Sequence, residues 1–153
     1  MANKSGRETD PLVGYQYRIE VSGSVKLTGY FTEVSGVGSE TEVIDHKVSG
    51  PKGEPIVQKL PGRMKWQDVV LKRGITADMQ LWQWRAYVEK GDIKSARANC
   101  SIIMLDLNGQ DVARWDFVNA WPSKVSGPTV KSDSNEFGVE ETTIVHEGMV
   151  RKT

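Results

Sequence analysis

The amino-acid sequence predicts a mainly β fold of the α+β type: an antiparallel β-barrel or sandwich with one flanking α-helix. Three observations predict it. Glycines and prolines divide the chain into short segments, several segments alternate apolar and polar residues with a period of two, and one segment has helical spacing. The 153 residues suffice for one domain and are too few for two, so residues 1–153 are predicted to form a single domain. Residues 1–12, whose start is polar, are expected to form a flexible N-terminal arm.

The first half of the chain predicts four strands. Tyr15–Val21 alternates apolar and polar residues, and Val25–Phe31 continues after a tight connection at Ser22–Ser24. Ser39–Val48 is polar at most positions but has the β-branched content of a solvated strand. Another strand runs over Val69–Gly74, where the glycine ends it.

One segment, Ala77–Lys90, predicts a helix. Thr76 suits its N-cap, and Gly91 suits the left-handed residue that closes it. Its apolar residues form two stripes on nearly opposite faces: Met79, Trp82 and Ala86 on one, and Leu81, Trp84 and Val88 on the other. A helix on the surface of a monomer needs one such stripe. The second meets either a long loop of the same subunit or a neighbouring subunit.

The second half of the chain predicts the remaining strands. Ile102–Leu107 is apolar on both faces, and Asn108–Gly109 is a strong hairpin signal. The returning strand is expected to end at Pro122, and its apolar face carries Ala113, Trp115, Phe117 and Trp121. Phe137–Val145 alternates as a last strand. The total is seven or eight strands.

Composition and motifs give no support to catalysis. Lys plus Arg and Asp plus Glu each total 20, so the basic surplus of a nucleic-acid binder is absent. No window approaches the ~20 apolar residues of a membrane-spanning helix, so no membrane anchor is expected. Cys100 is the only cysteine, which fits a reducing compartment. His46 and His146 have no second His or Cys at the spacing of metal ligands. Gly36–Gly38 resembles half of a nucleotide-binding turn, but no helix follows it that could hold a phosphate at its N-terminus. We expect no enzymatic activity, no cofactor and no metal.

Charge is unevenly distributed along the chain. Residues 49–74 hold six basic and two acidic residues, whereas residues 132–147 hold five acidic residues and no Lys or Arg. This pattern suits head-to-tail contact between copies, although the two segments could equally pair within one molecule or be solvated. Ser49–Met64 is predicted to be a long loop with an interaction role. The candidate contacts between subunits or rings are Lys52, Glu54, Lys59, Arg63, Trp84, Glu136 and Glu140.

Four runs resemble one family, in the same order as in that family. They are K-L-P-G-R-M-K-W-Q-D-V-V-L-K-R-G from Lys59, L-W-Q-W from Leu81, V-A-R-W-D-F-V-N-A-W-P-S-K from Val112 and N-E-F-G-V-E-E-T-T-I-V-H-E-G from Asn135. They resemble the tail-tube (inner tube) proteins of contractile phage tails and contractile injection systems. The resemblance extends from Tyr15 to about Arg151. Phe137-Gly138 departs from it, since smaller or β-branched residues are expected there.

The resemblance implies a β-barrel subunit that assembles into hexameric rings. Stacked rings form a rigid tube inside a contractile sheath, with DNA or effector cargo in the lumen and a baseplate or hub and tube-terminating proteins as further partners. The sheets of neighbouring subunits are expected to join edge to edge. The protein is expected to be made in the bacterial cytoplasm and to become part of a virion tail or injection particle. The candidate lumen-facing strand is Ser39–Val48, backed by a core, with Glu40, Glu42 and Lys47 toward the lumen.

A different class of function stays open at this point. A monomeric carbohydrate- or peptide-binding β-domain could use Trp66, Trp115 or Trp121 as a stacking platform. A small hydrolase is supported only by the presence of Ser, His and Asp. The mass of the purified protein separates the first two classes, because a tube subunit forms rings or polymers.

Overall fold

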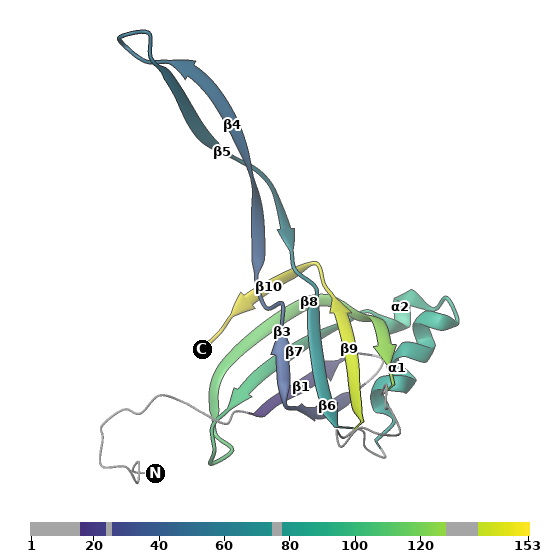
Figure 1. Ribbon diagram of the computed structural model, residues 1–153. Helices are drawn as coiled ribbons and strands as arrows, with labels where there is room; N and C mark the ends of the chain where they lie inside the picture. Colours follow the sequence, from purple (N-terminus) through teal and green to yellow (C-terminus); the bar gives the residue numbers. More distant parts are fainter. Residues whose placement is uncertain (1–15, 24–25, 75–77, 128–137) are drawn as a thin grey trace, which may run out of the picture.

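The computed structural model describes residues 16–23, 26–74, 78–127 and 138–153. It shows a β-barrel body, two helices beside it and a two-stranded hairpin that projects away from the body (Figure 1). The body strands are β1 (Gln16–Ser22), β2 (Leu27–Phe31), β3 (Glu33–Ser35), β6 (Val69–Gly74), β7 (Ala98–Leu105), β8 (Asp111–Ser126), β9 (Val139–Val145) and β10 (Gly148–Arg151). The helices are α1 (Gln80–Glu89) and α2 (Ile93–Ala96), and the hairpin strands are β4 (Ser39–Ser49) and β5 (Pro55–Trp66).

The body sheet closes on itself. Its strand order is β2-β1-β7-β8-β9-β6-β3, every pair is antiparallel, and β10 pairs with β8 next to β9. Only Thr32 separates β2 from β3, and its backbone N and its Oγ1 both donate to the carbonyl oxygen of Lys72 on β6, at 3.0 and 3.2 Å. The two ends of the strand order are therefore consecutive in the chain, which closes the barrel. The prediction of an antiparallel β-barrel with a flanking helix is confirmed.

The interior of the barrel is apolar. Alternate residues of β1, β2, β6 and β7 point inward, as the period of two predicts. The main members of this core are Ile19, Val21, Leu27, Phe31, Val69, Leu71, Ile102, Phe117 and Ile144. Each such side chain stabilises the fold by roughly 1.5–3 kcal/mol relative to full exposure. The body thus has a core of its own.

Strand β8 bends, and the bend corrects two predictions. Asn119 has a φ of +50°, and across it the inward-facing residues change from odd to even numbers, as Phe117 and Ala120 show. Trp121 therefore lies on the outer side and does not continue the face that carries Phe117. Pro122 does not end the strand, because the pairing with β9 shifts register directly after it and a residue without an N–H is tolerated at such an irregularity.

The helix is confirmed, with different bounds and a short partner. Helix α1 begins at Gln80, three residues after the predicted start, and Gly91 has the expected left-handed φ of +82°. Thr76 lies outside the described residues. Helix α2 follows after a short turn and was not predicted; the Asp92 side chain caps it by accepting a hydrogen bond from the Ser95 N–H at 3.2 Å.

Helix α1 buries one of its two stripes in its own subunit. Leu81 and Trp84 are fully buried, and Trp84 Nε1 donates to the Ala96 carbonyl oxygen at 2.7 Å. Met79 and Trp82 remain 61% and 37% exposed. The assignment of Trp84 to a subunit interface is therefore wrong, since its side chain is enclosed by α2 and the barrel; the exposed stripe is the other one.

The last predicted strand corresponds to β9, and β10 follows it as a further strand that was not predicted. β9 is confirmed as a strand, but its buried residues are Glu140, Thr142 and Ile144, not the apolar Val139 and Val145 that marked it in the sequence. Phe137 lies outside the described residues. The ten strands of the described residues exceed the seven or eight expected, because β3, β5 and β10 were not recognised as strands.

Candidate functional site

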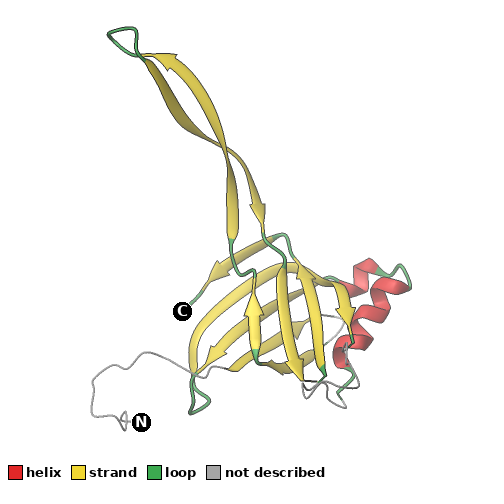
Figure 2. Cartoon of the chain, viewed as in Figure 1, coloured by secondary structure: helices red, strands yellow, loops and turns green. Residues whose placement is uncertain are grey.

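The feature that stands apart from the body is the long hairpin, residues 39–66. β4 and β5 pair antiparallel over their whole length, from Ser39 opposite Trp66 to Ser49 opposite Pro55, and project away from the barrel (Figure 2). At ~3.3 Å per residue, the 11 residues of β4 extend about 35 Å, similar to the ~30 Å diameter of a small domain. The prediction that Ser49–Met64 is a loop is wrong, because only residues 50–54 form the turn.

Two prolines explain why the segment of β5 was predicted to be a loop. Pro55 stands at the first position of β5, and Pro61 lies directly before an irregularity in the pairing, and these are two of the places where a strand tolerates proline. In the sequence the same prolines, with Gly53 and Gly62, read as loop punctuation.

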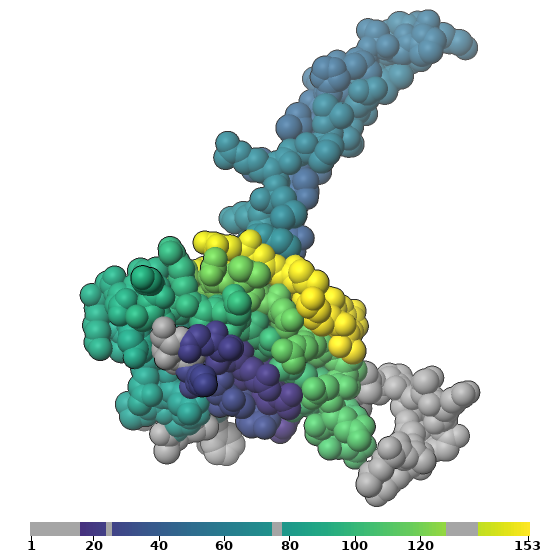
Figure 3. Space-filling view, turned by 180° about the vertical axis from the view of Figure 1, so that it is seen from behind, coloured from purple at the N-terminus to yellow at the C-terminus, as the bar shows by residue number. Residues whose placement is uncertain are grey.

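The hairpin has no core behind it. The space-filling view shows it standing clear of the body (Figure 3). Six of its large apolar side chains are 38–64% exposed: Val43, Ile44, Ile56, Val57, Leu60 and Met64. An isolated two-stranded hairpin is at best marginally stable in water, and contiguous exposed apolar side chains mark interaction surfaces. These apolar residues are candidate interface residues that were not predicted from the sequence, although Ile56, Val57 and Leu60 lie within the predicted loop.

Charges on the hairpin pair with each other. Lys59 Nζ lies 2.6 Å from Asp45 Oδ1 on the opposite strand, and both side chains are exposed. Lys65 stands opposite Glu40 in the register. Exposed pairs of this kind contribute ~0–1 kcal/mol. The basic stretch found in the sequence is therefore not a basic surface, because acidic residues of β4 lie beside it.

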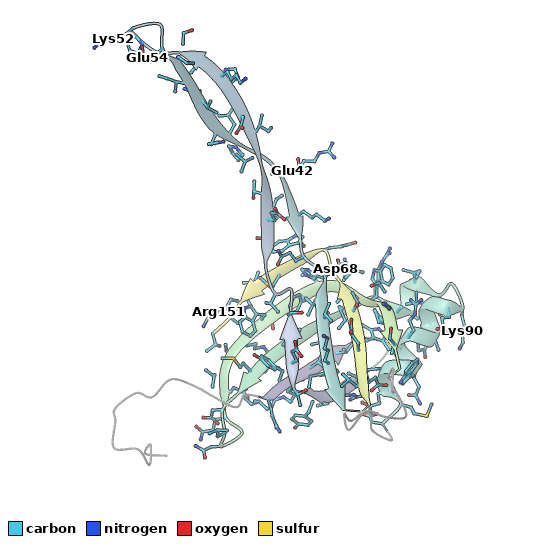
Figure 4. All side chains as sticks on the ribbon, in the orientation of Figure 1. Glu42, Lys52, Glu54, Asp68, Lys90 and Arg151 are labelled. Atoms are coloured by element: carbon cyan, nitrogen blue, oxygen red, sulfur yellow. The ribbon has the colours of Figure 1, made fainter. Side chains whose placement is uncertain are left out.

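The tip of the hairpin carries two candidate interface residues. Lys52 and Glu54 lie in the turn, farthest from the body, and Glu42 lies midway along the hairpin (Figure 4). The turn is held by the Gly50 N–H donating to the Glu54 carbonyl oxygen at 2.8 Å and by the Lys52 N–H donating to Glu54 Oε2 at 2.9 Å.

The root of the hairpin is held to the barrel by aromatic rings. The His146 ring centroid lies 4.7 Å from that of Phe117 in an edge-to-face arrangement and 5.7 Å from that of Trp66, the last residue of β5. Neither ring nitrogen makes a hydrogen bond of normal geometry. Burial lowers the pKa of His146, which outweighs the opposite effects of the backbone at Gln67 and Gly148 and of the nearby Asp68 carboxylate. The ring is thus neutral at neutral pH.

Backbone contacts reinforce the root. The Gln67 N–H donates to the Gly38 carbonyl oxygen at 3.1 Å, which joins the two ends of the hairpin. Gly36 has a φ of +80°, and a Cβ there would lie 1.9 Å from the Asp68 carbonyl oxygen. Only glycine fits this position. The Gly36–Gly38 segment that resembled half of a nucleotide-binding turn therefore has a structural role at the hairpin root.

The acidic segment of the sequence contributes to the interior of the body. Glu140 and Arg73 are only 2% and 5% exposed. They form an ion pair in which Arg73 Nε lies 2.9 Å from Glu140 Oε2. The other carboxylate oxygen of Glu140 accepts a hydrogen bond from Trp82 Nε1. The Arg73 guanidinium also lies over the Phe31 ring, 5.1 Å from its centroid. The assignment of Glu140 to a subunit interface is therefore wrong, because a buried ion pair occupies it. Glu136 lies outside the described residues.

The remaining candidates lie on the hairpin, whose arrangement differs from the one expected. Lys52, Glu54, Lys59 and Arg63 all belong to it, as do Glu40, Glu42 and Lys47 of the strand proposed to face a lumen. The expectation that this strand is backed by a core is wrong within the subunit, since nearly all of β4 is exposed on both faces. Its orientation toward a lumen remains a prediction.

Within the described residues, the three tryptophans considered as a stacking platform are not fully exposed. Trp66, Trp115 and Trp121 are each half-buried, and Trp115 lies beneath the Arg151 guanidinium, 5.8 Å from ring centroid to Cζ. A shallow cavity of about 450 Å³ on the outer face of β1, β7 and β8 is lined by no tryptophan; its lining residues are Glu20, Ser22, Asn99, Cys100, Ser101, Arg114, Asp116, Phe117 and Val118. This geometry gives no support to the carbohydrate-binding alternative.

The family follows from comparison with known proteins. Residues 13–150 match the family described as T4-like virus tail tube protein gp19. The chain belongs to that family. The resemblance seen in the sequence is confirmed, and this tail tube protein is a structural tube subunit. No match emerges from the comparison with curated protein sequences.

Solved structures share the fold of the tail tube protein. One is a chain of the PVC sheath–tube complex of an extracellular contractile injection system in its extended state, with a TM-score of 0.72, 20% identity and 99% of each chain covered. Another is a chain of the anti-feeding prophage cap, with a TM-score of 0.71, 19% identity and coverage of 100% of this chain and 99% of that one. Hcp1 from Flavobacterium johnsoniae is more distant: TM-score 0.51, 12% identity and coverage of 88% and 93%.

Two further findings concern the described part of the tail tube protein. Neither of its helices is long and apolar enough to cross a membrane. Within the same residues, no group of three or more His, Cys, Asp or Glu side chains is placed to hold a metal ion.

Proposed function

We propose that this tail tube protein forms the inner tube of a contractile tail or injection system. Six copies form a ring, rings stack into a rigid tube, and the lumen carries DNA or effector cargo inside a contractile sheath. The observation that carries the proposal is the long hairpin, which exposes apolar side chains on both strands and has no core of its own. The role is structural, without a catalytic step, cofactor or metal.

The hairpin supplies the energy for assembly. A large apolar side chain contributes roughly 1.5–3 kcal/mol when it goes from full exposure to full burial. The six on the hairpin are about half-exposed, so their complete burial against neighbouring copies stabilises the assembly by several kcal/mol per subunit. Because every copy carries one hairpin, the gain recurs at every subunit of a ring. Such a repeated contact between identical copies suits a closed symmetric assembly.

The edges of the barrel sheet also support assembly from several copies. The second edge of β2 meets the start of α1 at one point, where Gln80 Oε1 accepts a hydrogen bond from the Thr28 N–H at 3.3 Å. β10 pairs with β8 alone, so within the described residues its other edge has no strand beside it. A free edge is a template for a strand of another chain. We place the edge-to-edge junction with a neighbouring subunit at β10.

Other partners follow from the proposed tube. A sheath surrounds it, a baseplate or hub begins it and a terminating protein ends it. Assembly takes place in the bacterial cytoplasm, and the product is part of a virion tail or an injection particle. Glu40, Glu42 and Lys47 are the residues we expect at the lumen.

Electron microscopy and mass measurement test the proposal. The purified protein is expected to form rings or tubes as its concentration rises. Reversing two hairpin charges, Lys59→Glu with Arg63→Glu, is expected to impair assembly while the subunit keeps its folded circular dichroism spectrum, because both lie outside the barrel core. Lys94→Glu, on the exposed side of α2, is the matched control and should assemble normally. A wild-type protein that stays monomeric at high concentration contradicts the proposal.

A further inference from the structure

We propose that the root of the long hairpin is a proton-operated hinge. The neutral ring of His146 clamps Trp66 to the barrel and fixes the direction of the hairpin, and protonation of that ring releases the clamp so that the hairpin swings. The inference concerns a single subunit and goes beyond the proposed tube function.

The hinge lies where the chain passes twice between the barrel and the hairpin. One crossing is residues 36–38, between β3 and β4, and the other is residues 67–68, between β5 and β6. The Gln67 N–H, which donates to the Gly38 carbonyl oxygen at 3.1 Å, holds the two crossings together. Beyond them the hairpin projects clear of the body (Figure 1). The direction of this long arm therefore depends on the contacts at its root.

The first crossing is thin because two of its three residues are glycines. A Cβ at Gly36 would overlap the Asp68 carbonyl oxygen, and a Cβ at Gly38 would lie 3.1 Å from Gln67 Oε1. Gly36 and Gly38 thus place no side chain between the crossings to brace the hairpin. Val37, between the two glycines, packs against the barrel core and fixes the body side of the hinge.

Aromatic rings connect the hairpin to the barrel core. The His146 ring lies between β9 and β10 in the chain, and its centroid is 4.7 Å from that of Phe117 and 5.7 Å from that of Trp66. Phe117 is a buried member of the core, whereas Trp66 is the last residue of β5 and pairs with Ser39. His146 is therefore the link through which the core holds the hairpin.

The ring suits this position only while it is neutral. Both ring nitrogens of His146 are enclosed, and among the described residues neither has a hydrogen-bond partner of normal geometry. A neutral imidazole carries one N–H, whereas the protonated ring carries two and a positive charge. An enclosed N–H without an acceptor and an enclosed charge both destabilise the packed ring. Protonation therefore favours a state in which the ring reaches water.

The charges near the ring do not reverse this preference. The Asp68 carboxylate, at the hairpin root, favours the protonated ring, as does the backbone at Gln67 and Gly148 (Figure 4). Charged residues next to the contacting residues have partners elsewhere: Glu147 with Asn119 Nδ2 at 2.7 Å, Asp116 with Ser101 Oγ at 2.7 Å, and Lys65 opposite Glu40 in the register. Burial outweighs the favourable groups and lowers the pKa of His146.

The direction of the effect follows from the pKa in the two states. In the closed hinge the pKa of His146 lies below its ordinary 6.5, and in the open hinge the solvated ring has the ordinary value. The open state thus binds the proton more tightly, and its population rises as the pH falls below 6.5. Between the two pKa values the ratio of open to closed hinges rises by up to about tenfold per pH unit. At neutral pH the closed state is favoured.

Single-molecule fluorescence energy transfer tests the hinge at a dilution where subunits stay separate. Dyes are attached to Lys52→Cys in the hairpin turn and to Lys90→Cys after α1, two exposed positions, in the full chain with Cys100→Ala (Figure 4). One narrow distribution of transfer efficiency is expected at about pH 7.5. A second population is expected to grow as the pH falls toward about 5.

Three variants assign the response to the ring. His146→Phe keeps an aromatic ring in the contact but binds no proton, so it is expected to stay closed at both pH values. His46→Phe, on the exposed hairpin, is the matched control and should keep the full response. Asp68→Asn removes the carboxylate that favours the protonated ring in the closed state, so it should enlarge the open population in acid.

Several results overturn the hinge. They are an unchanged wild-type distribution between the two pH values, an equal response in His146→Phe, and a response that occurs only together with loss of the barrel's circular dichroism spectrum, since that is global unfolding. Should His146→Phe fail to fold, Asp68→Asn decides: an open population in acid no larger than that of the wild type overturns the hinge.

One consequence rests on the proposed function: in a tube, the hinge makes assembly depend on pH. Sedimentation is expected to show fewer wild-type tubes in acid than at neutral pH, and equal assembly of His146→Phe at both. Equal wild-type assembly at both pH values overturns this control of assembly. Protein that forms no tubes at either pH overturns the tube proposal and leaves the hinge, which is measured in separate subunits.

Discussion

The body and the long hairpin use similar residues in opposite ways. In the body, Ile19, Leu71 and Ile102 meet around a closed interior and are at most 1% exposed. In the hairpin, Ile44 and Leu60 face each other across two strands and remain about half-exposed, because no third layer covers them. The difference shows that period-two alternation creates an apolar face but does not determine what covers it. In the body the same chain covers that face, and in the hairpin we expect a neighbouring chain to do so.

The comparison predicts that body substitutions unfold the subunit. Trp84→Ala removes a fully buried ring and its hydrogen bond to Ala96, so the free energy of unfolding is expected to fall by about 3–5 kcal/mol. Chemical denaturation of the dilute subunit measures this. Met79→Ala, on the exposed stripe at the start of the same helix, is the control and should cost less. Equal losses would contradict the assignment of the buried stripe.

The buried ion pair offers the next largest effect. Glu140→Gln leaves the Arg73 charge without its carboxylate, and breaking such a pair typically costs about 3–5 kcal/mol, with the neutral amide at the lower end. The double substitution Arg73→Met with Glu140→Leu removes both charges and is expected to recover part of the loss. A double variant less stable than Glu140→Gln would show that the pair contributes more than the apolar replacement can.

The hairpin root should make stability depend on pH. Burial lowers the pKa of His146 from its ordinary 6.5, so the unfolded chain binds a proton at a pH where the folded chain does not. The free energy of unfolding is therefore highest above pH 6.5 and decreases as the pH falls below it. His146→Phe is expected to flatten this dependence, which lies at and below the ordinary value of about 6.5. A comparable change with His46→Phe, on the exposed hairpin, would contradict the assignment.

Hairpin substitutions should have the smallest effect on the isolated subunit. Ile44→Lys and Leu60→Lys lie outside the core and are expected to change its free energy of unfolding by at most ~0.5 kcal/mol. Sedimentation of the same variants should show that assembly is lost. A large destabilisation of the monomer would show that the hairpin unfolds cooperatively with the barrel, which contradicts the comparison.

Sequence reasoning succeeded where a local pattern decides the structure and failed where distant residues decide it. The strands around Ile19 and Ile102 and the helix around Trp84 follow from period and spacing. The burial of Glu140 does not, because its partner Arg73 is 67 residues away and no pattern near either residue indicates the pair.

The candidate site shows the same limit. The interaction role of residues 49–64 was predicted from length and composition, but the strand within it was not, because Pro55 and Pro61 are typical loop residues. Only the pairing with β4 shows that they occupy positions where a strand accepts proline. The register also decides which exposed apolar side chains share a face of the hairpin, so this grouping could not be predicted from the sequence.

Hydrogen–deuterium exchange of the β4 and β5 amides, compared between dilute subunits and assembled protein, is the most direct test of the central claim. That claim is that neighbouring copies cover the hairpin, which one subunit leaves exposed. The account predicts slow exchange in the barrel strands in both states, and hairpin amides that exchange quickly in the subunit and become protected on assembly. Equal protection of the hairpin in both states would contradict it.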